Sequence, residues 1–132
     1  MEFFQIDPPL VPTVVYLLTK IDADVDAIYV AVQGNRGPEY ALAESEAQAF
    51  KDAAYTSPAP SSVASWATAK GQTSQWSADN ILATAAAWRY AMRLIRTQRL
   101  AHKELARTSP DLAVVQASWD TFVKGIRTQL NV

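Results

Sequence analysis

From Ser77 to Ser109 the chain contains neither glycine nor proline. Alanine, leucine, arginine and methionine dominate this stretch, and all four favour helix intrinsically. Because serine is a good helix N-cap, we expect one long helix that begins at Ser77. Pro110 ends it, and the apolar periodicity from Leu112 to Leu130 predicts a second helix. A connection this short predicts that the two form a C-terminal antiparallel hairpin.

Shorter helices are predicted before this hairpin. Apolar residues follow Asp22 at the three- and four-residue spacing of a helix, so a helix is expected to start there. A proline at the first helical position predicts another helix from Pro38, and a short one follows over residues 62–70, ended by Gly71. The Gly-Asn-Arg-Gly stretch at 34–37 lacks the frame of a phosphate-binding loop and is interpreted as a turn. The fold class predicted is all-α, a helical bundle.

The N-terminus differs from the rest of the chain. Three prolines before Thr13 fix φ and lack the N–H donor, which opposes a helix. We therefore expect residues 1–20 to form an extended arm and residues 21–132 to form the helical domain. The β-branched start of segment 13–22 allows either one short strand or a first helical turn. The apolar side chains of the arm either fold back on the domain or dock on another chain, and they are Phe3, Phe4, Leu10 and Val11.

The composition restricts the chemistry that the chain can perform. With 132 residues, 49% of them hydrophobic, it can build one core and is too short for two ordinary domains. There is no cysteine and one histidine, which removes thiolate sites and most metal and acid–base chemistry. No apolar run approaches the roughly 18 residues of a membrane span, and the N-terminus lacks a basic signal-peptide region. We expect a soluble protein that is not an enzyme and needs no cofactor or metal.

Asp22, Asp24 and Asp26 alternate like the first three ligands of a helix–loop–helix calcium site. Such a loop also needs a glycine at its sixth position and a glutamate at its twelfth, where this chain has Ala27 and Gln33. The three acids are therefore interpreted as the acidic start of a helix, where free N–H groups and the helix dipole stabilise them.

Charge is distributed unevenly along the chain. Residues 1–60 carry nine acidic and three basic side chains, whereas residues 61–132 carry four acidic and nine basic ones. On the long helix the bases form a stripe that has three interpretations: a solvated face, a docking surface for an acidic partner or for the chain's own acidic half, and a contact with nucleic acid or membrane. The stripe comprises Arg89, Arg93, Arg96, Lys103 and Arg107, with Arg99 beside it.

Two further residue types invite a functional interpretation. The four tryptophans fit a small helical core, and some of them also suit an interface. His102 lies in a polar stretch of helix, without the sequence spacing of a catalytic partner. The four tryptophans are Trp66, Trp76, Trp88 and Trp119.

Four segments of the chain recur together in a known family. They are the Asp-rich stretch from Asp22, W-A-T-A-K-G at 66–71, A-D-N-I-L-A-T-A-A-A-W-R at 78–89, and S-W-D-T-F-V-K-G-I-R-T-Q-L at 118–130. In this combination the chain resembles, over roughly residues 20–130, small tail proteins encoded beside tail-fibre genes in tailed bacteriophages and prophages.

The resemblance implies a non-enzymatic helical protein that acts on or within a phage tail, in the virion or in the host cytoplasm during assembly. Some members of the family are described as tail-fibre assembly proteins, which implies chaperone-like binding to the fibre. The expected partner is thus a tail fibre or another tail protein, with a second copy of the chain as a further possibility. The residues expected to bind it are the basic stripe and the apolar side chains of the arm. The alternatives are a permanent structural subunit of the tail, whose arm binds a neighbouring chain, and a small nucleic-acid-binding or host-directed regulator.

Overall fold

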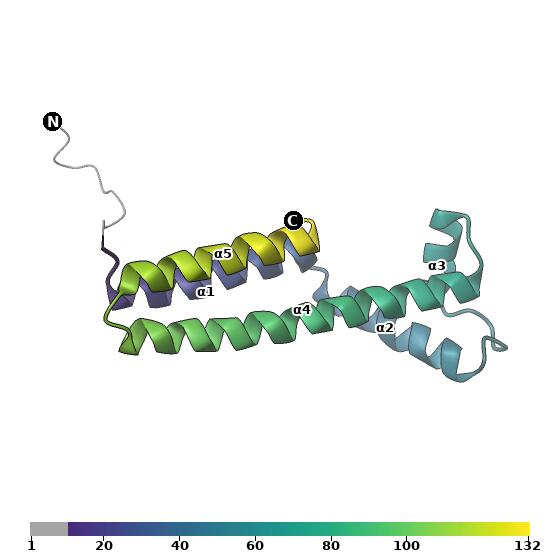
Figure 1. The fold of residues 1–132 in the computed structure, drawn as a ribbon. Coiled ribbons are helices and arrows are strands. Elements are labelled where there is room, and N and C mark those ends of the chain that lie inside the picture. The colour runs from purple at the N-terminus through teal and green to yellow at the C-terminus, as the bar shows by residue number, and fades with distance from the viewer. Residues whose placement is uncertain (1–10) are drawn as a thin grey trace, which may run out of the picture. The chain divides into compact units, whose positions relative to one another are not determined.

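The computed structural model describes residues 11–132, which form five α-helices and no strand (Figure 1). The all-α class expected from the sequence is confirmed, and the segment that could have formed a short strand is helical from Val14. The helices are α1 (Val14–Gln33), α2 (Gly37–Asp52), α3 (Ser61–Lys70), α4 (Ser74–Thr108) and α5 (Leu112–Leu130).

These helices form two compact units that share α4. One unit comprises the described part of Met1–Val32 together with Arg93–Val132, and the other comprises Gln33–Met92. The first unit therefore contains α1, the C-terminal part of α4 and α5. The second contains α2, α3 and the N-terminal part of α4.

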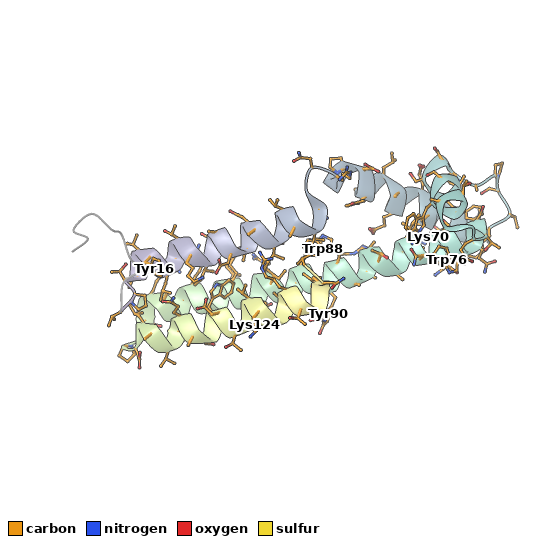
Figure 2. All side chains as sticks on the ribbon, turned by 90° about the horizontal axis from the view of Figure 1, so that it is seen from above. Tyr16, Lys70, Trp76, Trp88, Tyr90 and Lys124 are labelled. Carbon is orange, nitrogen blue, oxygen red and sulfur yellow. The ribbon has the colours of Figure 1, made fainter. Side chains whose placement is uncertain are left out.

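The first unit is a bundle of three helical segments that run side by side (Figures 1 and 2). Leu17, Ala106 and Val115 come from its three segments and form one buried cluster. Trp119 is also fully buried, and it lies edge-on to His102 at 5.3 Å between ring centroids. Only residues 109–111 connect α4 to α5, so the two helices are neighbours in the chain. The buried contacts between them hold them together.

Helix α1 begins earlier than the sequence indicated. Leu17 and Ile21 are fully buried, so the apolar face of the helix starts in its first turns. The expected boundary of an extended arm at residue 20 therefore falls inside α1. For the same reason Asp22, Asp24 and Asp26 lie in the middle of the helix, and their interpretation as a helix start was wrong.

The second unit has its own core. Ala47, Phe50, Val63 and Ala78 form a buried cluster drawn from α2, α3 and α4. As expected, Pro38 stands in the first turn of α2, and Gly71 ends α3 in the left-handed conformation at φ 63°. Glycine suits that position because it has no Cβ.

Ser77 is not the N-cap of the long helix. Helix α4 begins at Ser74, and the Thr73 hydroxyl accepts the Trp76 amide at 3.1 Å, as an N-cap side chain does. Ser77 is instead fully buried, and its hydroxyl donates to the Val63 carbonyl at 2.7 Å. Serine at this position therefore joins α4 to α3.

The four tryptophans are not equivalent. Trp119 is fully buried, whereas Trp66 and Trp88 are half-buried and Trp76 is 36% exposed. The Trp66 indole donates to Asn80 Oδ1 at 2.9 Å, and the Lys70 ammonium lies 5.0 Å from its ring. Trp119 therefore occupies a core position, whereas Trp76 does not.

Candidate interaction surfaces

Part of the basic stripe forms ion pairs within the first unit. Lys103 Nζ lies 2.7 Å from Asp22 Oδ2, and Arg99 Nη1 lies 3.7 Å from Asp22 Oδ1. Arg107 contacts Glu104 of its own helix at 3.4 Å. One aspartate of the acidic half thus binds two cations of α4, as one of the three interpretations of the stripe expected.

The rest of the stripe divides between the two units. In the second unit, the Arg89 guanidinium pairs with the Glu44 carboxylate of α2. In the first unit, Arg93 and Arg96 are exposed, and their side chains form neither an ion pair nor a hydrogen bond with any described residue. The stripe is therefore partly used within the chain and partly available to a partner.

Of the four apolar residues of the arm, Val11 is the one that the structure describes. Phe3, Phe4 and Leu10 lie outside the described residues, and Val11 is 70% exposed. Val15, just inside α1, is 74% exposed. The entry to α1 thus presents apolar surface to solvent.

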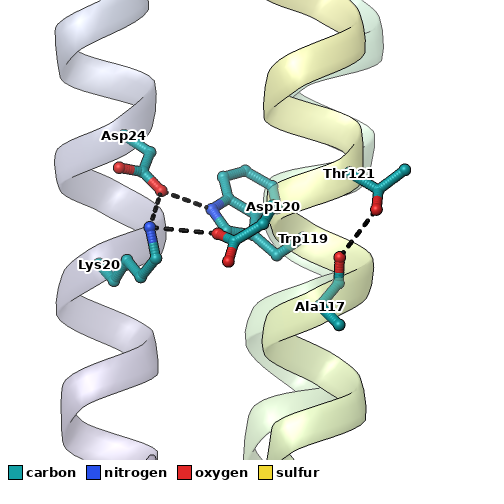
Figure 3. A network of polar contacts seen from close by, with 6 residues as sticks. All are labelled: Lys20, Asp24, Ala117, Trp119, Asp120 and Thr121. Carbon is teal, nitrogen blue, oxygen red and sulfur yellow. Dashed lines mark hydrogen bonds and ion pairs between the residues drawn. The ribbon is translucent and has the colours of Figure 1, made fainter. Parts of the chain in front are cut away.

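A polar network joins α1 to α5 (Figure 3). Asp24 Oδ2 accepts from Lys20 Nζ at 2.8 Å and from Trp119 Nε1 at 2.9 Å, and Lys20 Nζ also lies 3.2 Å from Asp120 Oδ1. Burial lowers the pKa of Lys20, but the hydrogen bonds and charges of Asp24 and Asp120 outweigh it, so this pKa is raised above 10.5. The lysine stays charged, and the network fixes the register of the two helices rather than moving protons.

His102 lies in the core of the first unit rather than on a polar surface. Its Nδ1 lies 2.8 Å from the Gln98 carbonyl oxygen, which can only accept, so Nδ1 carries the proton. Its Nε2 lies 3.0 Å from Ser118 Oγ, within hydrogen-bonding distance. Ser118 sits inside α5, where backbone N–H groups are already bonded within the helix and cannot stabilise an oxyanion. The pair therefore links α4 to α5.

A groove of about 1050 Å³ lies between α2 and α4 in the second unit. Its small side chains come from both helices, and its two cross-links are the Arg89–Glu44 pair and a hydrogen bond from the Tyr55 hydroxyl to Asp79. Beside its four alanines and Leu82 the groove is lined by polar residues such as Ser45 and Gln48, so its surface is mixed in polarity. The alanines that line it are Ala41, Ala49, Ala83 and Ala86.

Tyr55 is held in an uncommon backbone conformation. Ala54 and Tyr55 both have positive φ, 52° and 58°, a backbone conformation that residues other than glycine rarely adopt. The Tyr55 ring packs edge-on against Phe50 at 5.4 Å, and its hydroxyl donates to Asp79. The hydrogen bond, followed by burial and the charge of Asp79, raises the pKa of Tyr55 above 10.0.

This raised pKa leads to a testable expectation for Asp79→Ala. The variant removes both acceptor and charge, so the pKa of Tyr55 should fall towards 10.0. Since the folded pKa is the higher one, the bond stabilises the fold fully below pH 10.0, and its contribution is lost as the pH rises through the folded pKa. Alkaline titration of the tyrosine ring carbons by NMR measures this, with Tyr55→Phe assigning the signal. An unchanged Tyr55 midpoint in Asp79→Ala would contradict the expectation.

Between residues 11 and 132, no group of three or more His, Asp or Glu side chains is arranged to hold a metal ion. Within the same range, no helix is both long and apolar enough to cross a membrane.

The sequence did not single out two further basic residues. Lys124 and Arg127 of α5 are three positions apart and so lie on one side of that helix. Their spacing can be seen in the sequence. Which side of the unit they occupy follows only from the contacts of α5 with α1, such as the Lys20–Asp120 ion pair.

No protein-family model, no curated protein and no solved structure matches this chain.

Proposed function

We propose that this chain is a non-enzymatic phage tail-associated protein that binds a tail fibre and assists its assembly or attachment. The sequence resemblance supports the phage assignment. The structural observation that carries a binding role is the pair of exposed arginines, Arg93 and Arg96, which have no partner among the described residues. Arginine is enriched at protein interfaces, and exposed arginines without a partner in their own chain are available to the acidic groups of another protein.

A different observation favours a specific alternative, in which the protein remains in the virion as a structural subunit. Val11 and Val15 are 70% and 74% exposed where the chain enters α1, and an apolar entry of this kind suits attachment to a neighbouring chain. The two functions differ in the fate of the protein after assembly. A chaperone leaves, whereas a subunit stays in stoichiometric amount.

Co-expression with the tail-fibre protein of the same phage or prophage tests the proposal. We expect the two proteins to co-purify as a defined complex, and mass spectrometry of purified virions should find this chain absent or far below stoichiometry. A stoichiometric amount in virions would establish the subunit alternative instead. If no complex forms, and titrated duplex DNA binds with a steep salt dependence, the regulator alternative replaces both.

A further inference from the structure

The outward face of α1 carries an apolar strip. It lies opposite the buried residues of the same helix, and its two largest members, Val15 and Val30, are 74% and 69% exposed. Small residues between them keep the surface low, so another helix can approach closely. We define the α1 strip as Val15, Thr19, Ala23, Ala27 and Val30, all exposed.

Ion pairs place α4 and α5 on the two flanks of this strip. Asp22 pairs with Lys103 on one flank, and Lys20 pairs with Asp120 on the other. The three segments run side by side in Figures 1 and 2. The Asp22–Lys103 pair and the Leu17–Ala106 contact show that α1 and α4 run in opposite directions.

This register places four cations beside the C-terminal half of the α1 strip. Arg96 lies two turns before Lys103 on the same side of α4, and Arg93 lies one further turn back. On the other flank, Lys124 and Arg127 lie one and two turns after Asp120 on the same side of α5.

These four cations are available to a partner. Arg93, Arg96 and Lys124 are exposed and Arg127 is half-buried, and their side chains form neither ion pairs nor hydrogen bonds within residues 11–132. The one acid on this part of the α1 face is Asp26, which is exposed. An apolar strip thus lies between two basic rows.

From this arrangement we infer that the face binds an acidic amphipathic helix of a partner protein. The apolar side of that helix covers the α1 strip, and its carboxylates meet Arg93 and Arg96 on one flank and Lys124 and Arg127 on the other. The inference rests on the proposed function and deepens it, because it names the chemistry of the segment that docks.

Two other classes of partner fit the face less well. Nucleic acid would set its phosphates over the apolar strip, where Ala27 and Val30 offer no hydrogen-bond donors. A lipid surface is bound through larger side chains such as Trp, Phe and Leu, whereas the α1 strip holds valine and alanine. A second protein helix uses both the strip and its flanks.

A labelled synthetic helix tests the inference directly. The probe is a fluorescein-labelled peptide of about 20 residues, with leucines along one side and glutamates on both flanks, measured by fluorescence anisotropy. We expect the full-length chain to bind it, and Arg96→Glu or Arg127→Glu each to weaken binding about tenfold. The double variant should weaken it about a hundredfold, since the two residues lie on opposite flanks.

Further variants serve as a control for charge and as a second test of the strip. Lys51→Glu reverses an exposed base of the second unit and should leave the affinity unchanged, and circular dichroism confirms that every variant folds. Val30→Asp should also weaken binding, because it places a charge in the strip. The inference is overturned if the peptide does not bind, if the double variant binds it as the wild type does, or if self-association, duplex DNA or phosphatidylserine vesicles occupy the same face more tightly.

The inference and the proposed function can fail separately. If the tail-fibre protein binds the Arg96→Glu/Arg127→Glu variant as tightly as wild type, the function stands and this face is not its site. If the peptide binds as expected but no tail protein does, the face stands and the phage assignment falls.

Discussion

Trp119→Ala is expected to lower the free energy of unfolding by about 3–5 kcal/mol. Trp119 is fully buried, and its ring contacts His102 at 5.3 Å and Phe122 at 5.5 Å between centroids. Its indole also donates to Asp24 Oδ2 at 2.9 Å. The variant leaves a cavity between α1 and α5 and removes one donor from the Lys20 network, so both packing and hydrogen bonding are lost.

Urea denaturation followed by circular dichroism measures this loss, with Trp76→Ala as the matched control. Trp76 is 36% exposed, so its removal should change stability far less. Trp119→Phe separates the two contributions, because it keeps a ring and deletes the donor. We expect it to cost about 1–2 kcal/mol, since Asp24 keeps its bond to Lys20. Equal losses in Trp119→Ala and Trp76→Ala would contradict the assigned core.

The helices could be predicted because their local signals agree. The stretch from Ser77 to Ser109 has high helix propensity, and Gly71 and Pro38 stand where α3 ends and where α2 begins. The starts of α1 and α4 could not be placed in this way. Val14 and Val15 favour strand as readily as helix, so the burial of Leu17 decides the outcome, and burial depends on the other helices.

The sequence predicted the residues of the candidate surfaces only in part. Periodicity along one helix predicted the basic stripe, but it cannot say which acid each cation meets. Lys103 pairs with Asp22, far away in the sequence, because α1 and α4 pack with opposite directions. Lys124 and Arg127 became part of a surface only once Lys20 and Asp120 fixed the register of α5. Such pairings are properties of packing rather than of any single segment.

Phe50→Ala is expected to lower the free energy of unfolding by about 3–4 kcal/mol, with the damage concentrated in the second unit. Phe50 is 4% exposed and packs with Ala47, Val63 and Ala78. Its ring also supports Tyr55, which has a positive φ of 58°. Without that ring, one of the contacts that hold Tyr55 in the left-handed conformation is lost.

Hydrogen exchange read by mass spectrometry shows where Phe50→Ala acts. Because Phe50 belongs to the core of Gln33–Met92, peptides from α2 and α3 should exchange faster, while those from α1 and α5 stay protected. Tyr40→Ala is the matched control on the same helix, since Tyr40 is 46% exposed and its loss should leave exchange nearly unchanged. Trp119→Ala should produce the reverse pattern, with faster exchange in α1 and α5. If both buried variants loosened all five helices equally, the two cores would act as one cooperative unit, and the assignment of separate cores would be wrong.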